Sequence, residues 1–305
     1  MATPTKTVLV VGATGALGGL TVDRLLSKGH KVKALVRPSS HGSAALTAKG
    51  VELAVGDVLN PATLASALGG AGGVSAVVVA AAHFATAPKK TSTNEADIEG
   101  GRNLVDAAKA ANVSVFVLLS NVGADHPAAA NVAHFGTHLR VEEYLAQQGV
   151  PFVSLRTSAF LSTTNFRDLV SKYQINTLWG VDVKFSLVGF DTVARALADA
   201  VDVPAAIGRK IDLGTDRPVT AVELGKAFSD LLNGRHIGVG RVPPWLFTVI
   251  GWFSGFLYDV KIMGEFFDTG HFVADTTAQA ELFGPVQTVE EACQSFITAH
   301  NLKSK

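Results

Sequence analysis

The stretch TVLVVGATGALGG, residues 7–19, sets the architecture of the chain. It opens with TVLVVG (7–12), a continuous apolar run rich in valine, as expected of a strand that is buried on both faces. Glycines then recur at every third position, and residues 15–28 have the pattern of a helix that ends near Gly29. A strand, a glycine-rich turn and a helix in this order predict the beginning of a βαβ unit.

The three glycines of this turn have separate physical roles. Gly12 permits the tight turn, Gly15 lets a pyrophosphate approach the backbone, and Gly18 lets the helix pack closely against the strand. The first N–H groups of the helix then point at the phosphate. A glycine triplet alone is also compatible with an ordinary tight turn, but its place between a first strand and a helix favours dinucleotide binding. We therefore predict that the dinucleotide is held by Gly12, Ala13, Thr14, Gly15, Ala16, Leu17 and Gly18.

After this unit, short β-branched runs alternate with longer helical patterns through the first half of the chain. The predicted strands are 7–12, 31–36, 51–56, 75–82, 113–120 and 151–156, with a helix at 131–148 before the last of them. Strands joined by helices in this way form right-handed crossovers. The pattern predicts an α/β fold, a Rossmann-type doubly wound parallel sheet with helices on both faces.

Beyond about residue 160 the alternation is less regular. Short strand patterns occur in VKFSLV, KIDLG and HIGVGRV, among helical patterns at 190–203, 220–233, 244–257 and 288–299. We predict a dinucleotide-binding core at residues 1–157 and a smaller substrate-binding lobe at residues 158–305, with some elements returning to the core. Ligands of α/β proteins bind at the carboxyl ends of the strands, so we expect the lobe over that edge.

The composition is that of a folded protein with a sizeable core, because 48% of the 305 residues are hydrophobic and 17% are charged. Lys and Arg number 26, as do Asp and Glu, so the formal net charge is zero. The sequence contains no run of basic residues. Binding of nucleic acid through its phosphates is therefore not expected.

The single cysteine, Cys293, excludes an intramolecular disulfide and a cysteine-based metal cluster, and it fits a reducing compartment. The N-terminus runs directly into the first strand pattern without a signal peptide, so we expect a cytoplasmic protein. The most apolar segment, residues 242–258, contains two prolines and two glycines and is shorter than the roughly 20 apolar residues that span a bilayer. We expect this segment to cover a pocket rather than to insert stably into a membrane, with contact to a membrane surface as the alternative.

The end of the second strand predicts which dinucleotide binds. An acidic residue at this place would favour NAD, but the chain has Arg37, followed by Ser39. An arginine here can pair with the 2′-phosphate of NADP, and Ser39 can add a hydrogen bond. The alternative is a solvated surface arginine. We predict that NADP(H) is preferred.

The ends of the third and fourth strands complete the predicted cofactor site. Asp57 and Val58 follow the third strand, beside the expected adenine, although Asp57 also fits an Asx turn or a helix cap. Ala80, Ala81 and Ala82 end the fourth strand. Small residues there let the cofactor lie flat across the sheet edge, or simply pack the core.

The chain resembles the short-chain dehydrogenase/reductase superfamily in its atypical, NmrA-like branch, near the isoflavone-reductase-like and NAD(P)H-sensing members. The resemblance rests on VLVVGATGALGG, VELAVGDVLNPATLASAL, NLVDAAKAANVSVFVLLSNVGA and HLRVEEYLAQQGVPFVSLRTSAFL, and it covers about residues 7–161. A fainter likeness continues through FSLVGFDTVARALADAV and FGPVQTVEEACQSFI. The resemblance implies a Rossmann fold that binds NAD(P), and it specifies no substrate.

The resemblance also implies active-site positions. The family serine at the end of the fifth strand corresponds to Ser120, and the family tyrosine and lysine correspond to His134 and His138. NmrA-like members often lack the tyrosine but keep the lysine, whereas this chain lacks both. The stretch RTSAFL resembles the turn that faces the nicotinamide, which implies that this ring is contacted by Thr157, Ser158 and Phe160.

Three interpretations of the two histidines remain open. In the first, His134 or His138 donates a proton to the substrate, since an unperturbed pKa of about 6.5 suits a general acid. His138 could also hydrogen-bond the nicotinamide ribose. In the second, both residues only line a cofactor cleft, because residues four apart share one helix face. In the third, they bind a metal. Glu142 is not a third ligand, because His134 and Glu142 lie about 12 Å apart along a helix, which is too far for one ion, so this interpretation requires two histidines and further ligands from elsewhere in the chain.

The sequence therefore predicts an NADPH-dependent oxidoreductase that reduces a small apolar carbonyl, quinone or activated double bond. The predicted apolar pocket consists of Trp245, Phe247, Trp252, Phe253, Phe256 and Tyr258, which could equally form the core of the lobe. The alternative is a non-catalytic NADP(H)-sensing protein with a protein partner, as the missing tyrosine and lysine suggest. Epimerase chemistry is a weaker third hypothesis, since such relatives keep both residues.

Overall fold

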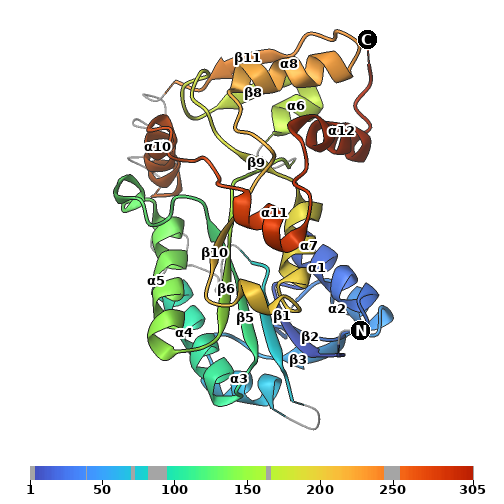
Figure 1. Ribbon diagram of the computed structural model, residues 1–305, viewed down its shortest axis with the longest axis vertical. Helices are drawn as coiled ribbons and strands as arrows, with labels where there is room; N and C mark the ends of the chain where they lie inside the picture. The colour runs from blue at the N-terminus through green and yellow to red at the C-terminus, as the bar shows by residue number, and fades with distance from the viewer. Residues whose placement is uncertain are drawn as a thin grey trace.

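Figure 1 shows the protein as a computed structural model. It describes residues 4–38, 40–69, 73–81, 95–162, 166–243 and 255–304, without the side chains of Glu95, His134 and residues 255–259. The centre of the molecule is a seven-stranded parallel sheet in the order β10-β6-β5-β4-β1-β2-β3. Its strands are β1 (Thr7–Val11), β2 (Lys31–Val36), β3 (Glu52–Val55), β4 (Ala76–Val79), β5 (Val115–Asn121), β6 (Phe152–Thr157) and β10 (Lys210–Leu213).

The central strand β1 is apolar on both faces. Val8 lies opposite Val32 of β2 and Ala76 of β4, so β1 is hydrogen-bonded on both sides. Val10 points into the core on one face of the sheet and Leu9 into the core on the other, and both side chains are fully buried. A strand with this pattern requires helices above and below it.

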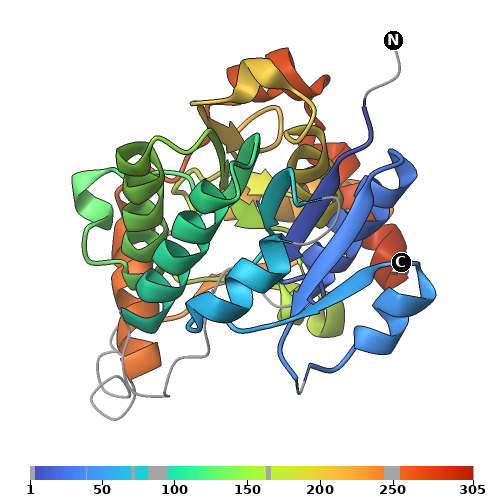
Figure 2. The same cartoon turned by 90° about the horizontal axis from the view of Figure 1, so that it is seen from below.

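Helices cover both faces of the sheet (Figure 2). One face carries α1 (Ala16–Ser27), α2 (Ser43–Ala48) and α7 (Phe190–Asp199). The other carries α3 (Pro61–Leu68), α4 (Glu95–Ala110) and α5 (Ala133–Gln148). Although α7 belongs to the second half of the sequence, it packs against α1 and contributes to the same core.

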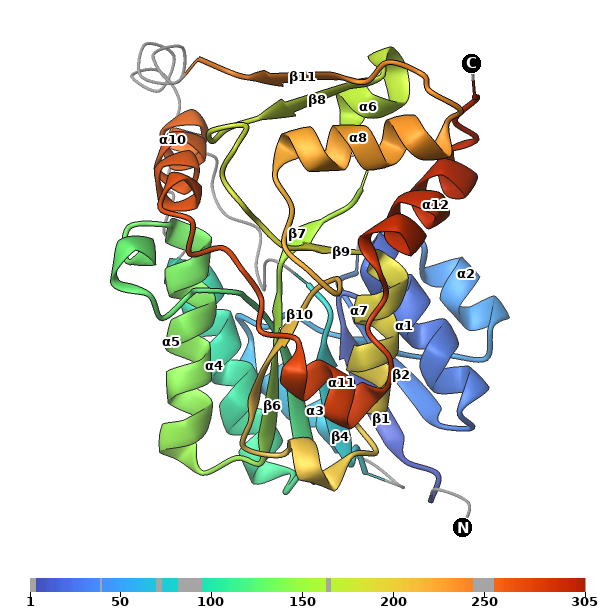
Figure 3. The same ribbon diagram turned by 45° about the horizontal axis from the view of Figure 1, so that its top comes forward.

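A smaller set of elements lies over the carboxyl ends of the strands (Figure 3). Two short parallel sheets pair β7 (Ala159–Phe160) with β9 (Leu187–Val188), and β8 (Gln174–Thr177) with β11 (Gly238–Arg241). The accompanying helices are α6 (Arg167–Lys172), α8 (Ala221–Leu231), α10 (Gly255–Asp268) and α12 (Val289–His300), while α11 (Thr277–Phe283) packs against β10. These elements share a separate, aromatic-rich core that includes Phe228, Phe266 and Phe296.

The predicted α/β fold with a doubly wound parallel sheet is confirmed. Element boundaries differ from the prediction by a few residues. The fourth strand ends at Val79 rather than at residue 82, and the fifth runs from Val115 to Asn121 rather than over 113–120. The pattern KIDLG forms β10, which pairs with β6 and extends the central sheet by one edge strand. A run of apolar residues identifies the interior of a buried strand. The exact ends of the strand depend on its hydrogen-bonding partners, which the sequence pattern does not specify.

The predicted helix 244–257 lies largely outside the described residues, and α10 begins only at Gly255. Within the described ranges, no helix combines the length and apolarity needed to cross a bilayer.

Candidate active site

The glycine turn is packed so tightly that two of its positions exclude a side chain. Gly12 has a φ of +85°, and a Cβ built there would lie 2.8 Å from Cβ of Ala81. A Cβ at Gly18 would lie 2.0 Å from the carbonyl oxygen of Gly12. Gly15, the N-cap of α1, supplies no side chain to the free N–H groups of the first helical turn. The turn therefore offers an uncovered backbone surface, and such a surface can accept a phosphate.

The segment that follows β2 lies next to this turn. A Cβ at Gly42 would be 3.7 Å from Cβ of Thr14, so Gly42 lies next to the glycine turn. Arg37 is exposed, and its backbone N–H donates to Oγ of Ser40 at 3.2 Å. Ser39 lies outside the described residues. A guanidinium at this position is accessible to a ligand bound along the turn.

Asp57, which was predicted to lie beside the adenine, makes a local turn. Its Oδ1 accepts a hydrogen bond from the backbone N–H of Leu59 at 2.9 Å, which is the geometry of an Asx turn. Val58 is buried and Ala81 is partly exposed beside the glycine turn. Ala82 lies outside the described residues. The carboxylate is therefore used at least in part to shape the loop after β3.

A pocket of about 410 Å³ opens at the carboxyl ends of β5 and β6. Asn121 and Thr157 end these two strands and form part of its lining, followed along the chain by Ser158 and Phe160. The opposite wall is aromatic and apolar, with Phe135, Phe166, Trp179, Met263, Phe267 and Phe272. We name this cavity the aromatic pocket.

The aromatic wall is held by contacts between rings. Trp179 packs edge-on against Phe267 with ring centroids 4.7 Å apart, and Phe267 lies 4.4 Å from Phe272 with the two rings tilted by 35°. The indole N–H of Trp179 is buried, and it has no hydrogen-bond partner among the described residues. An unpaired buried donor is costly, so a ligand acceptor at this position would be favoured.

This wall differs from the one that the sequence suggested. Four of the predicted aromatic residues, Trp245, Phe247, Trp252 and Phe253, lie outside the described residues, and nothing is described of the side chains of Phe256 and Tyr258. The observed ring residues come instead from α5, from the segment after β8 and from both sides of the end of α10. The sequence analysis singled out none of these wall residues, because a local pattern does not specify which cavity an aromatic side chain faces.

His138 is buried in the interior of the protein, where its Nδ1 lies 2.6 Å from the carbonyl oxygen of Leu119. A carbonyl can only accept, so Nδ1 carries a proton and a neutral ring has Nε2 as its acceptor. Ser120, the next residue of β5, is also buried, and its Oγ has no hydrogen-bond partner among the described residues. The backbone of His134 belongs to the first turn of α5, and its side chain is not described. Ser120 and His138 thus lie on the neighbouring elements β5 and α5 and are not part of the described lining of the aromatic pocket.

The sequence analysis did not predict the ion network that Glu142 forms on the same helix as His138. The buried Glu142 accepts from Nη2 of Arg156 at 2.7 Å and from Oγ of Ser154 at 2.6 Å. Lys210 approaches the same carboxylate at 3.3 Å, and Asp125 accepts from Nη1 of Arg156 at 2.8 Å. Glu142 therefore ties α5 to β6 and β10, one helical turn after His138. Because its carboxylate oxygens already contact these groups, Glu142 is not available as a third metal ligand beside the two histidines.

Burial alone would raise the pKa of Glu142, but the hydrogen bonds and the charge of Arg156 outweigh burial and hold this pKa below its usual value. The Ser120 hydroxyl contributes in the same direction, although its geometry falls short of a normal hydrogen bond. Glu142 is therefore a carboxylate at neutral pH and acts as an anchor rather than as a proton donor.

Comparisons with known proteins agree with this architecture. The photosystem II assembly factor Ycf39 of Guillardia theta is 28% identical over 259 residues, which cover 82% of this chain and 77% of that protein. Sanguinarine reductase of Eschscholzia californica is 26% identical over 271 residues, which cover 74% of this chain and 95% of that protein.

Solved structures show the same fold. The Citrobacter sp. triphenylmethane reductase complexed with NADP(H) superposes with a TM-score of 0.77 at 20% identity, over 95% of this chain and 99% of that chain. The NADPH-dependent quinone oxidoreductase of Escherichia coli superposes with a TM-score of 0.76 at 21% identity, again over 95% and 99% of the two chains. The sequence profile described as the NmrA-like family matches residues 4–295. The chain therefore belongs to the NmrA-like family, as the sequence motifs predicted.

Proposed function

We propose that this protein is an NADPH-dependent oxidoreductase that reduces a small apolar carbonyl, quinone or activated double bond. The observation that carries the proposal is the position of two features at one edge of the sheet. The glycine turn excludes side chains at Gly12 and Gly18, and the aromatic pocket opens at the ends of β5 and β6. In doubly wound folds, dinucleotides bind across this edge. The names of the NADP(H)-bound and NADPH-dependent structural neighbours and of sanguinarine reductase support the same activity.

The residues present fit NADPH at each part of its expected path. The turn from Gly12 to Gly18 cradles the pyrophosphate against the N-terminus of α1, and Arg37 pairs with the 2′-phosphate. Thr157, Ser158 and Phe160 line the aromatic pocket on the side of that edge, where we expect them to orient the nicotinamide toward the acceptor. When bound, the cofactor supplies the hydride. The aromatic wall excludes water and holds a flat apolar acceptor.

We propose His138 as the residue that replaces the family lysine. The contact of its Nδ1 with the carbonyl oxygen of Leu119, at 2.6 Å, fixes the orientation of the ring at the position where the family lysine would approach the nicotinamide ribose. His138 becomes a proton donor through Nε2 only when the ring is protonated. Ser120 and His134 remain the other candidates for the proton that the reduced substrate takes up.

Filling the aromatic pocket tests this proposal. Met263→Trp is expected to lower kcat/KM for quinones and enones by at least about a hundredfold, because the added ring displaces the acceptor from the nicotinamide. NADPH affinity should not change. The measurement is NADPH consumption, followed by nicotinamide absorbance against a panel of aldehydes, ketones, quinones and enones, with His134→Ala and His138→Ala alongside.

The matched control is Glu265→Trp, which adds the same ring to the same helix at an exposed position outside the pocket lining. It should keep normal turnover. Equal turnover in the two tryptophan variants would contradict an active site in the aromatic pocket. A panel in which only polar sugars are reduced would contradict the apolar substrate class.

Arg37→Ala tests the choice of cofactor. We expect the wild-type protein to bind NADPH more tightly than NADH, and we expect the substitution to weaken NADPH binding about ten- to a hundredfold while NADH binding is unchanged. The physical reason is the loss of a charge-assisted hydrogen bond to the 2′-phosphate. Arg209→Ala, at the opposite end of the sheet before β10, is the control and should leave both affinities unchanged. Equal titration curves for NADPH and NADH in the wild-type protein would refute this role of Arg37.

A second candidate function is an NADP(H)-binding regulatory protein without turnover. Two observations favour it, namely the replacement of both the tyrosine and the lysine by histidines and the naming of several relatives as photosystem II assembly factors. This function predicts tight NADPH binding, no reduction of any compound in the panel, and a protein partner whose affinity depends on the bound dinucleotide. Hydride transfer at an ordinary enzymatic rate would make it unnecessary.

A further inference from the structure

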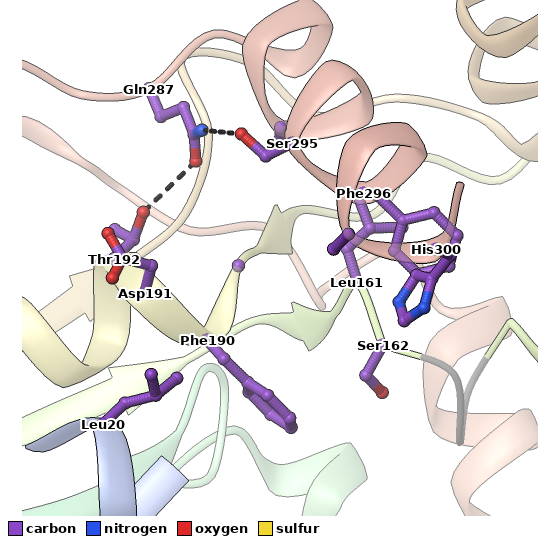
Figure 4. Close-up of a pocket in the computed structure, with 13 residues that line it drawn as sticks. Leu20, Leu161, Ser162, Phe190, Asp191, Thr192, Gln287, Ser295, Phe296 and His300 are labelled. Atoms are coloured by element: carbon purple, nitrogen blue, oxygen red, sulfur yellow. Dashed lines mark hydrogen bonds between the residues drawn. The ribbon is translucent and has the colours of Figure 1, made fainter. Parts of the chain in front are cut away.

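A second pocket, of about 350 Å³, lies between helices α1 and α7 of the core and helix α12 (Figure 4). Its walls come from α1, from residues 161–162, from the first turn of α7 and from one face of α12. None of the residues predicted to bind the cofactor lines it. It is next to the aromatic pocket, because Phe190 in its lining packs edge-on against Phe160 at a centroid distance of 4.8 Å. Its volume falls within the range of small-molecule sites, roughly 300–1,000 Å³.

Most of this pocket is apolar. Leu20 of α1 lines it and is 37% exposed, which makes it one of few exposed large hydrophobic residues in the described part of the chain. Leu161, Phe190 and Phe296 supply further apolar surface, and Ala299 keeps one side of α12 open. Such a lining favours the apolar body of a ligand over water.

Two polar groups at this pocket have no partner among the described residues. Ser162 is only 7% exposed, yet its hydroxyl makes no hydrogen bond within the described part of the chain. The ring of His300 packs edge-on against Phe296 at 4.4 Å, and neither of its nitrogens is hydrogen-bonded to a residue that the structure describes. In the view of Figure 4 both residues lie on the same side of the pocket. A hydroxyl and a neutral imidazole can each donate and accept, so together they match a ligand hydroxyl.

The remaining polar groups are already paired. Gln287 accepts from Thr192 at 3.2 Å and donates to Ser295 at 3.3 Å, as Figure 4 shows. The carboxylate of Asp191 is 2.6 Å from the guanidinium of Arg24, so its charge is balanced within the protein. The pocket has no unbalanced cation for an anionic ligand among its described lining residues. An uncharged ligand therefore fits best.

We propose that this second pocket binds a small, uncharged, mainly apolar molecule that carries one hydroxyl group, such as a simple phenol. The apolar body contacts Leu20, Phe190 and Phe296, and the hydroxyl hydrogen-bonds Ser162 and His300. A molecule in this position contacts both α1, which covers the central sheet, and α12, which belongs to the elements over the carboxyl ends of the strands. The site is separate from the proposed active site, and its occupation requires neither NADPH nor turnover.

The test is a calorimetric titration of the full chain with 4-ethylphenol. We expect saturable binding, and binding about tenfold weaker for ethylbenzene and for the Ser162→Ala variant, since each lacks one side of a hydrogen bond in a buried site. Ala299→Trp fills the pocket and should abolish binding. Gln294→Trp adds the same ring to the exposed face of α12 and should leave binding unchanged.

The aromatic pocket is a competing site for any phenol, so Met263→Trp is titrated in parallel. Binding that persists in Met263→Trp and disappears in Ala299→Trp supports the proposal. Binding that disappears in Met263→Trp but persists in Ala299→Trp overturns it, and so does the absence of saturable binding in the wild-type protein. Each of these results is independent of whether the protein oxidises NADPH.

Discussion

Replacing Glu142 by glutamine is expected to lower the free energy of unfolding by about 3–5 kcal/mol. The side chain of Glu142 has no exposed surface, and it accepts two hydrogen bonds from Arg156, at 2.7 Å and 3.2 Å. Removing its charge leaves a buried guanidinium with only Asp125 as an ionic partner, and the Asp125 side chain is 53% exposed. Because domains are stable by only about 5–15 kcal/mol, this loss should be visible in a denaturant titration.

The matched control is Glu143→Gln, the same chemical change one residue later on the exposed face of α5. It should change stability by less than about 0.5 kcal/mol. The double variant Glu142→Met/Arg156→Met separates charge from packing, since replacing a whole buried ion pair by apolar groups is often neutral. If Glu142→Gln were as stable as Glu143→Gln, the network would contribute no stability and α5 would be held by apolar packing alone.

The same carboxylate predicts the pH dependence of stability. The folded-state pKa of Glu142 lies below its unfolded value, because Arg156 outweighs the effect of burial. Its contribution is therefore fully present above the unfolded pKa of about 4.3 and is lost as the pH falls through the lower folded pKa. The difference in stability between the wild type and Glu142→Gln should be constant near neutral pH and shrink below about pH 4. A difference that grows on acidification would contradict the depressed pKa.

Gly18→Ala is expected to abolish NADPH binding and to destabilise the fold by about 1–3 kcal/mol or more. The new Cβ would meet the carbonyl oxygen of Gly12 at 2.0 Å, and that atom belongs to backbone that cannot rotate away. Either α1 moves off β1 or the turn changes shape, and both movements disrupt the surface that we propose receives the pyrophosphate.

Gly19→Ala provides a control of the opposite sign. It lies in the same helix, and its Cβ would meet its nearest atom, the carbonyl oxygen of Ala13, at 3.9 Å, an ordinary contact. Alanine is a better helix former than glycine, so this variant should be more stable by up to about 1 kcal/mol and should bind NADPH normally. Thermal unfolding and NADPH fluorescence titration of the two variants are the measurements. Similar behaviour of the two would show that close packing at Gly18 does not matter.

Local patterns were sufficient for the central sheet and for the glycine turn. A strand buried on both faces must be continuously apolar, and a position with no room for a side chain must be glycine. The strand and the turn could therefore be predicted from the residue types in TVLVVGATGALGG. The identity of the NmrA-like family followed from the order of such motifs. The same reasoning placed Arg37 at the end of the second strand, where β2 ends at Val36.

Contacts between distant segments were decided only by the tertiary structure. The aromatic pocket joins residues from α5, from the segment after β8 and from α10, and no periodicity within one segment indicates which cavity its aromatic side chains face. In the sequence, Glu142 is one polar position in a helical pattern. Its partners Arg156 and Lys210 lie on two different strands, β6 and β10, which come close to α5 only in the folded sheet. The sequence by itself thus determined the architecture of the central sheet and the glycine turn, because these depend on the conformation of neighbouring residues. The pocket linings and the buried ion network depend on packing across the whole chain.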